Sequence, residues 1–253
     1  MPDFRQQVAL VTGGAAGIGE ATARAFAQAG AAVMIADIDP AIARTAEALA
    51  ASGYIIAYHQ VDVSSASGCA DMVAACLARF GRLDAAVNNV GVVDPQSTAS
   101  DILTTDDWDR TISLSLSSVF YCIRAQLGPM LAAGRGTIVN TASIAGLVSL
   151  SGRFAYVTAK HGIIGLTKAI CDTYADAGIR CNAVAPGLIE TPGMRRSGDD
   201  GNAASVARFL ERVPSGRPGT ADEIAQAILW LSSAEANYVN GTTLAIDGGY
   251  VVR

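Results

Sequence analysis

The stretch Thr12-Gly13-Gly14-Ala15-Ala16-Gly17-Ile18-Gly19 decides the fold because of what stands on either side of it. It directly follows the apolar run Val8–Val11, which predicts a short buried strand, and it opens an amphipathic helical pattern to about Ala29. A second apolar run, Ala32–Ala36, follows and ends at Asp37. Strand, glycine-rich turn, helix and strand together predict a βαβ unit.

Strand and helix patterns continue to alternate along the chain. Mostly apolar runs predict further strands over Ile55–Val63, Leu83–Asn89, Thr137–Ser143, Ile179–Ala185 and Thr242–Ile246. Helical patterns lie over Pro40–Ala51, Ser65–Phe80, Asp106–Ala133 and Ala155–Ala175, with a last helix that Thr220 and Glu223 cap and that runs to Ser233. Strand runs without polar alternation are typical of a parallel sheet covered by helices on both faces. We therefore expect an α/β fold with a doubly wound parallel sheet of about seven strands, whose carboxyl edge collects ligands.

Size and composition limit the possible functions. The chain has 253 residues, is 51% hydrophobic and carries a net charge of -5, which argues against nucleic acid or an anionic membrane as a partner. No apolar run reaches the roughly 20 residues of a membrane span. The start, Met1–Arg5, lacks the pattern of a signal peptide. We expect one cytoplasmic domain over residues 1–253, with a substrate lid near 188–213.

The cysteines and histidines do not suggest a metal site. None of the five cysteines forms a Cys-x-x-Cys pair, and only His59 and His161 are available as histidine ligands. Scattered thiols of this kind fit a reducing compartment, and packing is the expected role of Cys69 and Cys76. We expect no metal.

The glycine turn predicts a dinucleotide site. Gly13, Gly17 and Gly19 let the backbone approach a ligand closely, and the following helix offers N–H groups and the positive end of its dipole to a phosphate. Asp37, at the end of the next strand, can accept hydrogen bonds from the adenosine ribose hydroxyls and would repel a ribose phosphate. Since the turn holds no basic residue, the pattern predicts NAD rather than NADP. Capping of the next helix is the alternative role of Asp37, although Asp39 is as well placed for it.

Tyr156, Lys160 and Ser143 suggest acid/base chemistry. Tyr156 and Lys160 are four residues apart, so they share one face of the predicted helix. A phenol has a pKa of about 10, but a neighbouring ammonium and a positive nicotinamide both favour the phenolate. Ser143, at a strand end, can hold a substrate oxygen. A Tyr-x-x-x-Lys pair alone is common, but with Ser143 and the glycine turn it predicts hydride transfer between nicotinamide and an alcohol or carbonyl carbon.

These motifs, together with Asp62-Val63, Asn88-Asn89-Val90-Gly91, Pro186-Gly187 and Ile246–Gly249, resemble the short-chain dehydrogenase/reductase family over the whole chain. The resemblance implies a Rossmann-type fold, a homotetramer, Tyr156 as acid/base, Lys160 on the nicotinamide ribose, and Ser143 orienting the substrate. It implies NAD contacts from the turn and the strand ends, namely Gly13, Ala16, Gly17, Ile18, Gly19, Asp37, Ile38, Asp62, Val63, Asn88, Asn89, Val90, Gly91, Tyr156, Lys160, Pro186, Gly187, Ile189 and Thr191.

Two positions depart from the family's pattern. Ser115, seven residues after Trp108, stands where family members commonly have an Asn that joins the catalytic group. That Asn anchors a water leading from the lysine to solvent, chiefly through its main-chain carbonyl. A carbonyl survives substitution and serine also bonds water, so we expect the relay to be retained. Val90 stands where alanine is usual, and we expect its extra bulk to change packing without removing function.

The expected substrate is a neutral secondary alcohol or ketone, cyclic or hydroxysteroid-like, because the expected pocket is mainly apolar. Its residues are predicted to include Ser143, Ala145, Leu150, Tyr156, Leu188 and Met194. Reduction of a 3-oxoacyl thioester on a carrier protein is an alternative, although Ala16 and Asp37 disfavour the NADP that such enzymes more often use. An NAD-sensing protein without catalysis is a second alternative, but it would be marked by loss of the tyrosine or the lysine. Enoyl reductases of this fold space these two residues differently.

Overall fold

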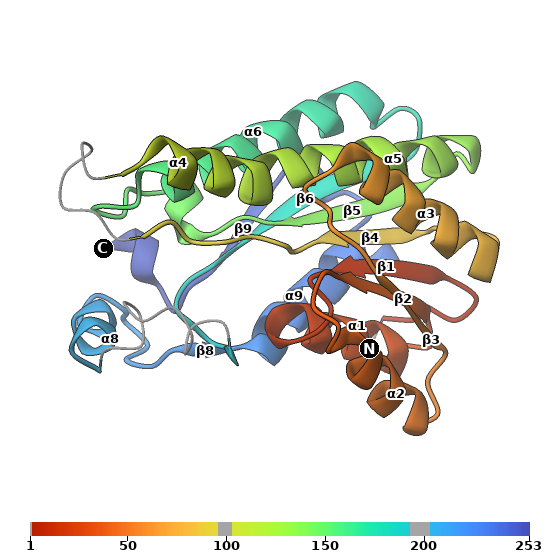
Figure 1. The fold of residues 1–253 in the computed structure, drawn as a ribbon, viewed down its shortest axis with the longest axis horizontal. Coiled ribbons are helices and arrows are strands. Elements are labelled where there is room, and N and C mark those ends of the chain that lie inside the picture. The colour runs from red at the N-terminus through yellow and green to blue at the C-terminus, as the bar shows by residue number, and fades with distance from the viewer. Residues whose placement is uncertain (1, 96–102, 193–202) are drawn as a thin grey trace.

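The computed structural model describes residues 2–95, 103–192 and 203–253. Seven parallel strands form one sheet between two layers of helices (Figure 1). The strands are β1 Val8–Thr12, β2 Ala32–Asp37, β3 Ile56–Gln60, β4 Ala85–Asn88, β5 Gly136–Thr141, β6 Ile179–Pro186 and β9 Thr243–Ile246. Their order is β3-β2-β1-β4-β5-β6-β9, and all neighbouring pairs are parallel. This confirms the predicted doubly wound sheet.

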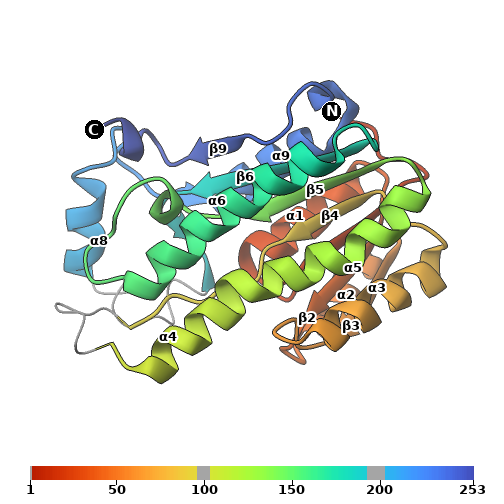
Figure 2. The same ribbon diagram turned by 90° about the horizontal axis from the view of Figure 1, so that it is seen from above.

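The two helical layers explain why the strands lack polar alternation. Helices α1 (Gly17–Gln28), α2 (Ile42–Ala51) and α9 (Ala221–Ser232) cover one face, while α3 (Ala66–Phe80), α5 (Ser118–Ala132) and α6 (Phe154–Tyr174) cover the other (Figures 1 and 2). Ala9 and Val11 of β1 belong to the first core, and Val8 and Leu10 to the second. Successive side chains of a strand point to opposite faces, so a strand covered on both sides is apolar throughout.

The chain order reverses between β1 and β4, which are hydrogen-bonded neighbours. Their carboxyl ends therefore lie together, and the backbone N–H of Asn89 donates to Oγ1 of Thr12 over 2.9 Å. A switch point of this kind is where open α/β sheets bind ligands. It carries the glycine turn on one side and the Asn88–Gly91 segment on the other.

The long helix predicted over Asp106–Ala133 contains an interruption. Helix α4 (Thr105–Ile112) passes into a π-helical turn, Ser113–Ser117, and then into α5. The N–H of Ser118 bonds to the carbonyl of Ser113, five residues earlier, and its hydroxyl donates to the carbonyl of Leu114 over 2.7 Å. Such a turn adds one residue to the helix and is frequent at functional sites. Ser115 lies in its middle and is completely buried.

The carboxyl-terminal third contains elements that the sequence did not predict. Strands β7 (Ile189–Glu190) and β8 (Gly219–Thr220) form a small parallel pair, and α8 (Ala203–Leu210) precedes β8. The capping box of α9 is confirmed, since Thr220 and Glu223 bond reciprocally to each other's backbone N–H. None of the helices in the described ranges combines the length and apolar character that a membrane crossing requires.

Candidate active site

The glycine turn forms a cradle that side chains would fill. Gly13 and Gly17 have φ values of +67° and +62°, a region that L side chains rarely adopt. A Cβ on Gly19 would lie 1.9 Å from the carbonyl oxygen of Gly13. Helix α1 begins here after Ala16, whose side chain offers no cap. The N–H groups of a first helical turn have no partners within the helix, so the turn fits a dinucleotide pyrophosphate.

Asp37 is held against this turn. One carboxylate oxygen accepts from the N–H of Ala15 over 3.0 Å, and the other accepts from the N–H of Asp39 over 3.0 Å. Asp39 in turn accepts from the N–H of Ala41, at the start of α2, over 2.8 Å. Neither carboxylate caps α2 itself, because the N-cap of this helix is Ala41 and it has no side-chain cap bond. Ile38, between them, is 62% exposed.

Asn88 and Asn89, predicted together, have different surroundings. The amide of Asn89 lies against the turn, with Nδ2 2.9 Å from where a Cβ on Gly13 would stand. Asn88 is 1% exposed, and its amide bonds to Gln126 and Asn140. Only the backbone of Asn88 is thus available to line a nucleotide.

The remaining predicted cofactor residues lie at or just beyond strand ends. Asp62 is exposed and Val63 is buried after β3, while Ile18 is half-buried in the first turn of α1. Val90 packs over the turn, with Cγ2 3.5 Å from the Cβ position of Gly13. Beyond β6, Thr191 approaches the Cβ position of Gly17 to 3.4 Å. This segment, which includes Pro186, Gly187 and Ile189, therefore reaches back to the glycine turn.

The end of β5 and the start of α6 bring the catalytic candidates together. Nζ of Lys160 lies 5.4 Å from the centroid of the Tyr156 ring and donates to the carbonyl of Thr141, at the end of β5, over 2.8 Å. Two residues on, Ser143 accepts from the N–H of Ala145 over 3.1 Å and begins a 3₁₀ turn. Tyr156 is half-buried and Ser143 is 8% exposed.

Lys160 is 3% exposed, and this burial lowers its pKa from 10.5 to about 8, because the charged form loses its hydration. An ammonium this close to a phenol stabilises the phenolate. The pair thus combines a phenol that can carry a proton with a neighbouring amino group.

Ser115 approaches the lysine through Gly91. Its hydroxyl donates to the carbonyl of Val92 over 2.8 Å and accepts from the N–H of Val92 over 2.9 Å. A Cβ on Gly91 would lie 3.1 Å from Nζ of Lys160 and 3.5 Å from Oγ of Ser115. The π-helical turn thus places Ser115 near Lys160, on the other side of Gly91, which has no side chain to separate them.

Two supporting groups were missed from the sequence. The first is a buried polar network in which Asn140 joins Asn88 of β4 to Thr167 of α6, with bonds of 2.9 and 3.0 Å. An Asn inside a predicted buried strand was the available signal. The second is Asp94, 1% exposed, which accepts from the N–H of Ala155 in the first turn of α6 over 3.1 Å. Both fix α6 and so the positions of its catalytic candidates.

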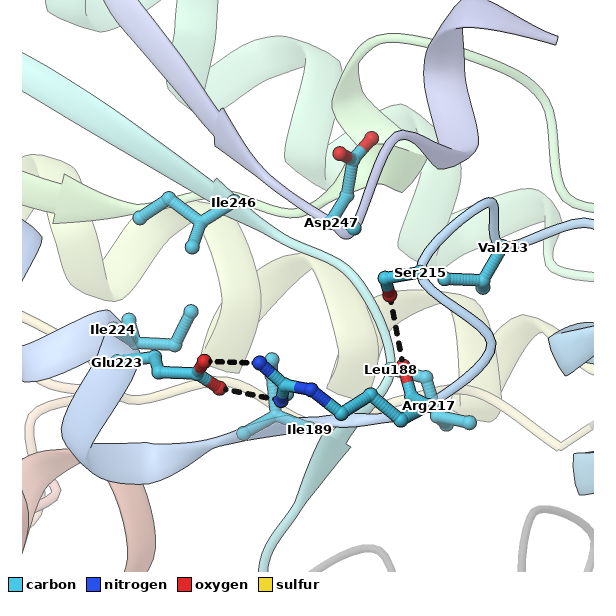
Figure 3. A pocket seen from close by; sticks show the side chains of 11 residues that line it. Leu188, Ile189, Val213, Ser215, Arg217, Glu223, Ile224, Ile246 and Asp247 are labelled. Carbon is cyan, nitrogen blue, oxygen red and sulfur yellow. Dashed lines mark hydrogen bonds and ion pairs between the residues drawn. The ribbon is translucent and has the colours of Figure 1, made fainter.

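The predicted substrate residues are only partly brought together. Leu150 packs on a small cluster that contains Ile144, the residue after Ser143, whereas Ala145 is completely buried. Leu188 instead lines a cavity of about 120 Å³ between the segment after β6, the start of α9 and the end of β9 (Figure 3). Ser143, Tyr156 and Lys160 do not line that cavity. Met194 lies outside the described residues.

Comparison with known proteins agrees with the geometry. The family model described as Enoyl-(Acyl carrier protein) reductase matches residues 13–251. A cis-4-hydroxycyclohexanecarboxylate dehydrogenase of Sinomonas cyclohexanicum is 40% identical, over 98% of this chain and 97% of its own. A cyclohexanol dehydrogenase of an Acinetobacter species is 37% identical, over 99% and 97%. A 3beta-hydroxysteroid dehydrogenase of Eggerthella lenta is 37% identical, over 98% and 96%.

Solved structures show the same architecture. Levodione reductase superposes with a TM-score of 0.93 at 34% identity, over 98% of this chain and 99% of its own. A putative 2-deoxy-d-gluconate 3-dehydrogenase from Agrobacterium tumefaciens, with NADP bound, gives a TM-score of 0.89 at 33% identity, over 99% and 98%. Matches of this extent and identity, on a chain with the Tyr-x-x-x-Lys pair, establish that the protein belongs to the short-chain dehydrogenase/reductase family.

Proposed function

We propose that this protein is an NAD-dependent dehydrogenase that interconverts a cyclic secondary alcohol and its ketone. The observation that carries the proposal is the approach of Lys160 to Tyr156, 5.4 Å from Nζ to ring centroid, with the same Nζ bonded to the carbonyl of Thr141, two residues before Ser143. The glycine cradle at the switch point supports a dinucleotide next to this group. When bound, the nicotinamide supplies the hydride acceptor for oxidation and the hydride donor for reduction.

The chain's residues then handle the proton. In the oxidation direction the phenolate of Tyr156 accepts the hydroxyl proton of the alcohol. Oγ of Ser143 donates a hydrogen bond to the substrate oxygen and opposes its charge as the proton leaves. The ammonium of Lys160 stabilises the phenolate before this transfer. Ser115, across Gly91 from Lys160, is placed to help return protons to solvent through water.

NAD is the proposed cofactor because Asp37 presents a fixed negative charge at the turn, bonded to the N–H of Ala15. We expect Asp37→Ala combined with Ile38→Arg to raise the ratio of kcat/KM for NADP to that for NAD by about 10- to 100-fold. This factor corresponds to the free energy of one charge-assisted hydrogen bond. Asp37→Asn is the matched control, since it removes the charge and keeps an acceptor. If the ratio stays at the wild-type value in the double variant, the assignment of Asp37 is wrong.

A ring alcohol is the proposed substrate class. The loop after Ser143 is mainly apolar, with partly buried Leu150 packed on the cluster that contains Ile144, and three relatives are named for ring alcohols. The test measures NAD and NADP reduction with cyclohexanol, 4-hydroxycyclohexanecarboxylate, a 3β-hydroxysteroid and open-chain secondary alcohols. We expect kcat/KM to be highest with a ring alcohol and NAD.

Two other results would redirect the proposal. Faster turnover of a 3-oxoacyl thioester with NADPH than of any ketone would favour a carrier-protein reductase. Tight NAD binding without turnover of any alcohol, ketone or thioester would favour a nucleotide-sensing protein. In the latter case, Tyr156→Phe would leave all measured properties unchanged.

The organisation of the protein completes the proposal. One domain would hold both cofactor and substrate, with a substrate lid near 188–213, of which residues 193–202 lie outside the described ranges. A homotetramer is supported by exposed aromatic side chains on α4 and α5, where Trp108 is 38% and Phe120 is 47% exposed. Light scattering on the purified protein gives the mass, and a monomer would rule out the tetramer.

A further inference from the structure

The last seven residues, Asp247–Arg253, form a segment that we call the C-terminal clamp. The carboxylate of Asp247 accepts from the N–H groups of Gly249 and Val251, both over 2.9 Å. Gly248 and Gly249 have φ values of +64° and +92°, so glycine is needed for this reversal after β9. The turn carries Tyr250 inward, where it is 2% exposed.

The clamp holds the end of α8. The ring of Tyr250 stacks on that of Phe209, with centroids 4.5 Å apart and an interplanar angle of 11°. The guanidinium of Arg212 lies 4.5 Å from the centroid of the Tyr250 ring. None of the other described helices or strands packs extensively on α8. The aromatic stack is therefore the main side-chain attachment described for this helix.

The chain after α8 is fixed to the same clamp through its backbone. The N–H of Ser215 donates to the carbonyl of Gly248 over 3.1 Å, and a Cβ on Gly249 would lie 2.9 Å from Cγ of Pro214. Val213, Ser215 and Asp247 all line the cavity described above (Figure 3). We call residues 203–215, that is α8 and the chain after it, the α8 arm. Attachment at Phe209, Arg212 and Ser215 leaves this arm little freedom to shift.

Tyr250 also contacts the catalytic side of the molecule. It shares a small hydrophobic cluster with Val213 and with Ile144, which directly follows Ser143. Leu150 packs on the same cluster. One buried ring thus joins the loop after Ser143 to the arm that carries α8.

We infer that Tyr250 is a specificity-determining positioning residue: it sets the distance between α8 and the loop after Ser143, and so fits the space between them to a ring alcohol. The inference rests on the proposed dehydrogenase function. Tyr250 acts through Phe209 and Ile144 and takes no part in proton transfer. Loss of its ring should loosen substrate binding and leave cofactor binding unchanged.

The test compares Tyr250→Leu with Tyr250→Phe, which keeps the ring. In Tyr250→Leu we expect KM for the best ring alcohol to rise roughly tenfold, the factor that corresponds to a lost aromatic pair. We also expect the variant to prefer ring alcohols over open-chain alcohols less than the wild type does. Tyr250→Phe should restore both values, and the Kd for NADH should match the wild type throughout. Phe4→Leu is the matched control, because Phe4 is 1% exposed and pairs with Phe26 at 4.9 Å, in the core beneath α1.

A second readout needs no turnover. Trypsin should cleave Tyr250→Leu after Arg208 or Arg212 several times faster than the wild type or Phe4→Leu, because the arm is no longer docked. Equal cleavage rates would overturn the role of the clamp, and an unchanged KM and ring preference would overturn its role in specificity. If the wild type oxidises no alcohol, the proposed function fails, while the cleavage rates still decide whether Tyr250 docks α8.

Discussion

The burial of Lys160 predicts a specific dependence of stability on pH. Its ammonium is 3% exposed and its pKa falls from 10.5 to about 8 because the charged form is desolvated. Between these two values the unfolded chain holds a proton that the folded protein has lost. The free energy of unfolding therefore rises with pH through this window. The contribution of Lys160 to the free energy of unfolding is complete above the pKa of the unfolded state, 10.5, and is lost as the pH falls through the pKa of the folded state, about 8.

The size of the effect follows from the two pKa values. A shift from 10.5 to about 8 corresponds to about 3 kcal/mol when integrated over the whole window. Between about pH 7 and about pH 9.5, the part that can be measured before tyrosines titrate, it amounts to about 2 kcal/mol.

The measurement is urea unfolding of the wild type and Lys160→Met across this range, without cofactor. We expect the wild type to gain about 2 kcal/mol relative to the variant as the pH rises. Lys168, the chain's second lysine, is exposed on the same helix, so Lys168→Met is the control and should parallel the wild type. Parallel curves for the wild type and Lys160→Met would refute the desolvation argument.

Three further substitutions probe the same group. Tyr156→Phe should lower kcat by about a thousandfold and leave the Kd for NADH unchanged, since only the proton carrier is lost; a near-native kcat would remove Tyr156 from the mechanism. Ser115→Ala should lower the free energy of unfolding by about 1 to 3 kcal/mol, because the N–H and carbonyl of half-buried Val92 lose their partner; an unchanged urea midpoint would contradict this. Gly91→Ala would place a Cβ 3.1 Å from Nζ of Lys160 and should reduce kcat about tenfold, as measured at saturating cofactor, whereas wild-type turnover would show that the lysine can shift freely.

The sheet was predictable from the sequence because its strands are covered on both faces. Val8–Val11 could be recognised as a strand because it is short and apolar. The glycine turn after it predicted that a helix would follow. The interruption at Ser113–Ser117 was not predictable in this way, since one extra residue hardly disturbs a helical pattern of that length. Strands β7 and β8 are two residues each, too short for any period to show.

Site residues were predictable where a local motif defines them and less so where the surroundings do. Nζ of Lys160 lies 5.4 Å from the centroid of the Tyr156 ring, as the spacing of the two residues requires, and bonds to Thr141, two residues before Ser143. Asn88 was expected beside the adenosine, yet its side chain is buried in the core while that of Asn89 lies at the turn. Successive residues at a strand end point to opposite faces, so adjacent positions cannot both face the cofactor by their side chains. Which of the two faces the turn depended on Gln126 and Asn140, from other elements.

The buried network and the buried lysine are parts of one arrangement. Lys160 donates to the carbonyl of Thr141, and the residue before it, Asn140, joins β4 to Thr167, two turns beyond Lys160 on α6. The network thus attaches α6 to Asn140 of β5, the residue next to Thr141, whose carbonyl accepts from Lys160. Without this attachment, α6 could shift so that the ammonium of Lys160 regains contact with water. We therefore expect that weakening the network, as in Thr167→Val, would raise the pKa of Lys160 toward its ordinary value and flatten the pH dependence of stability described above.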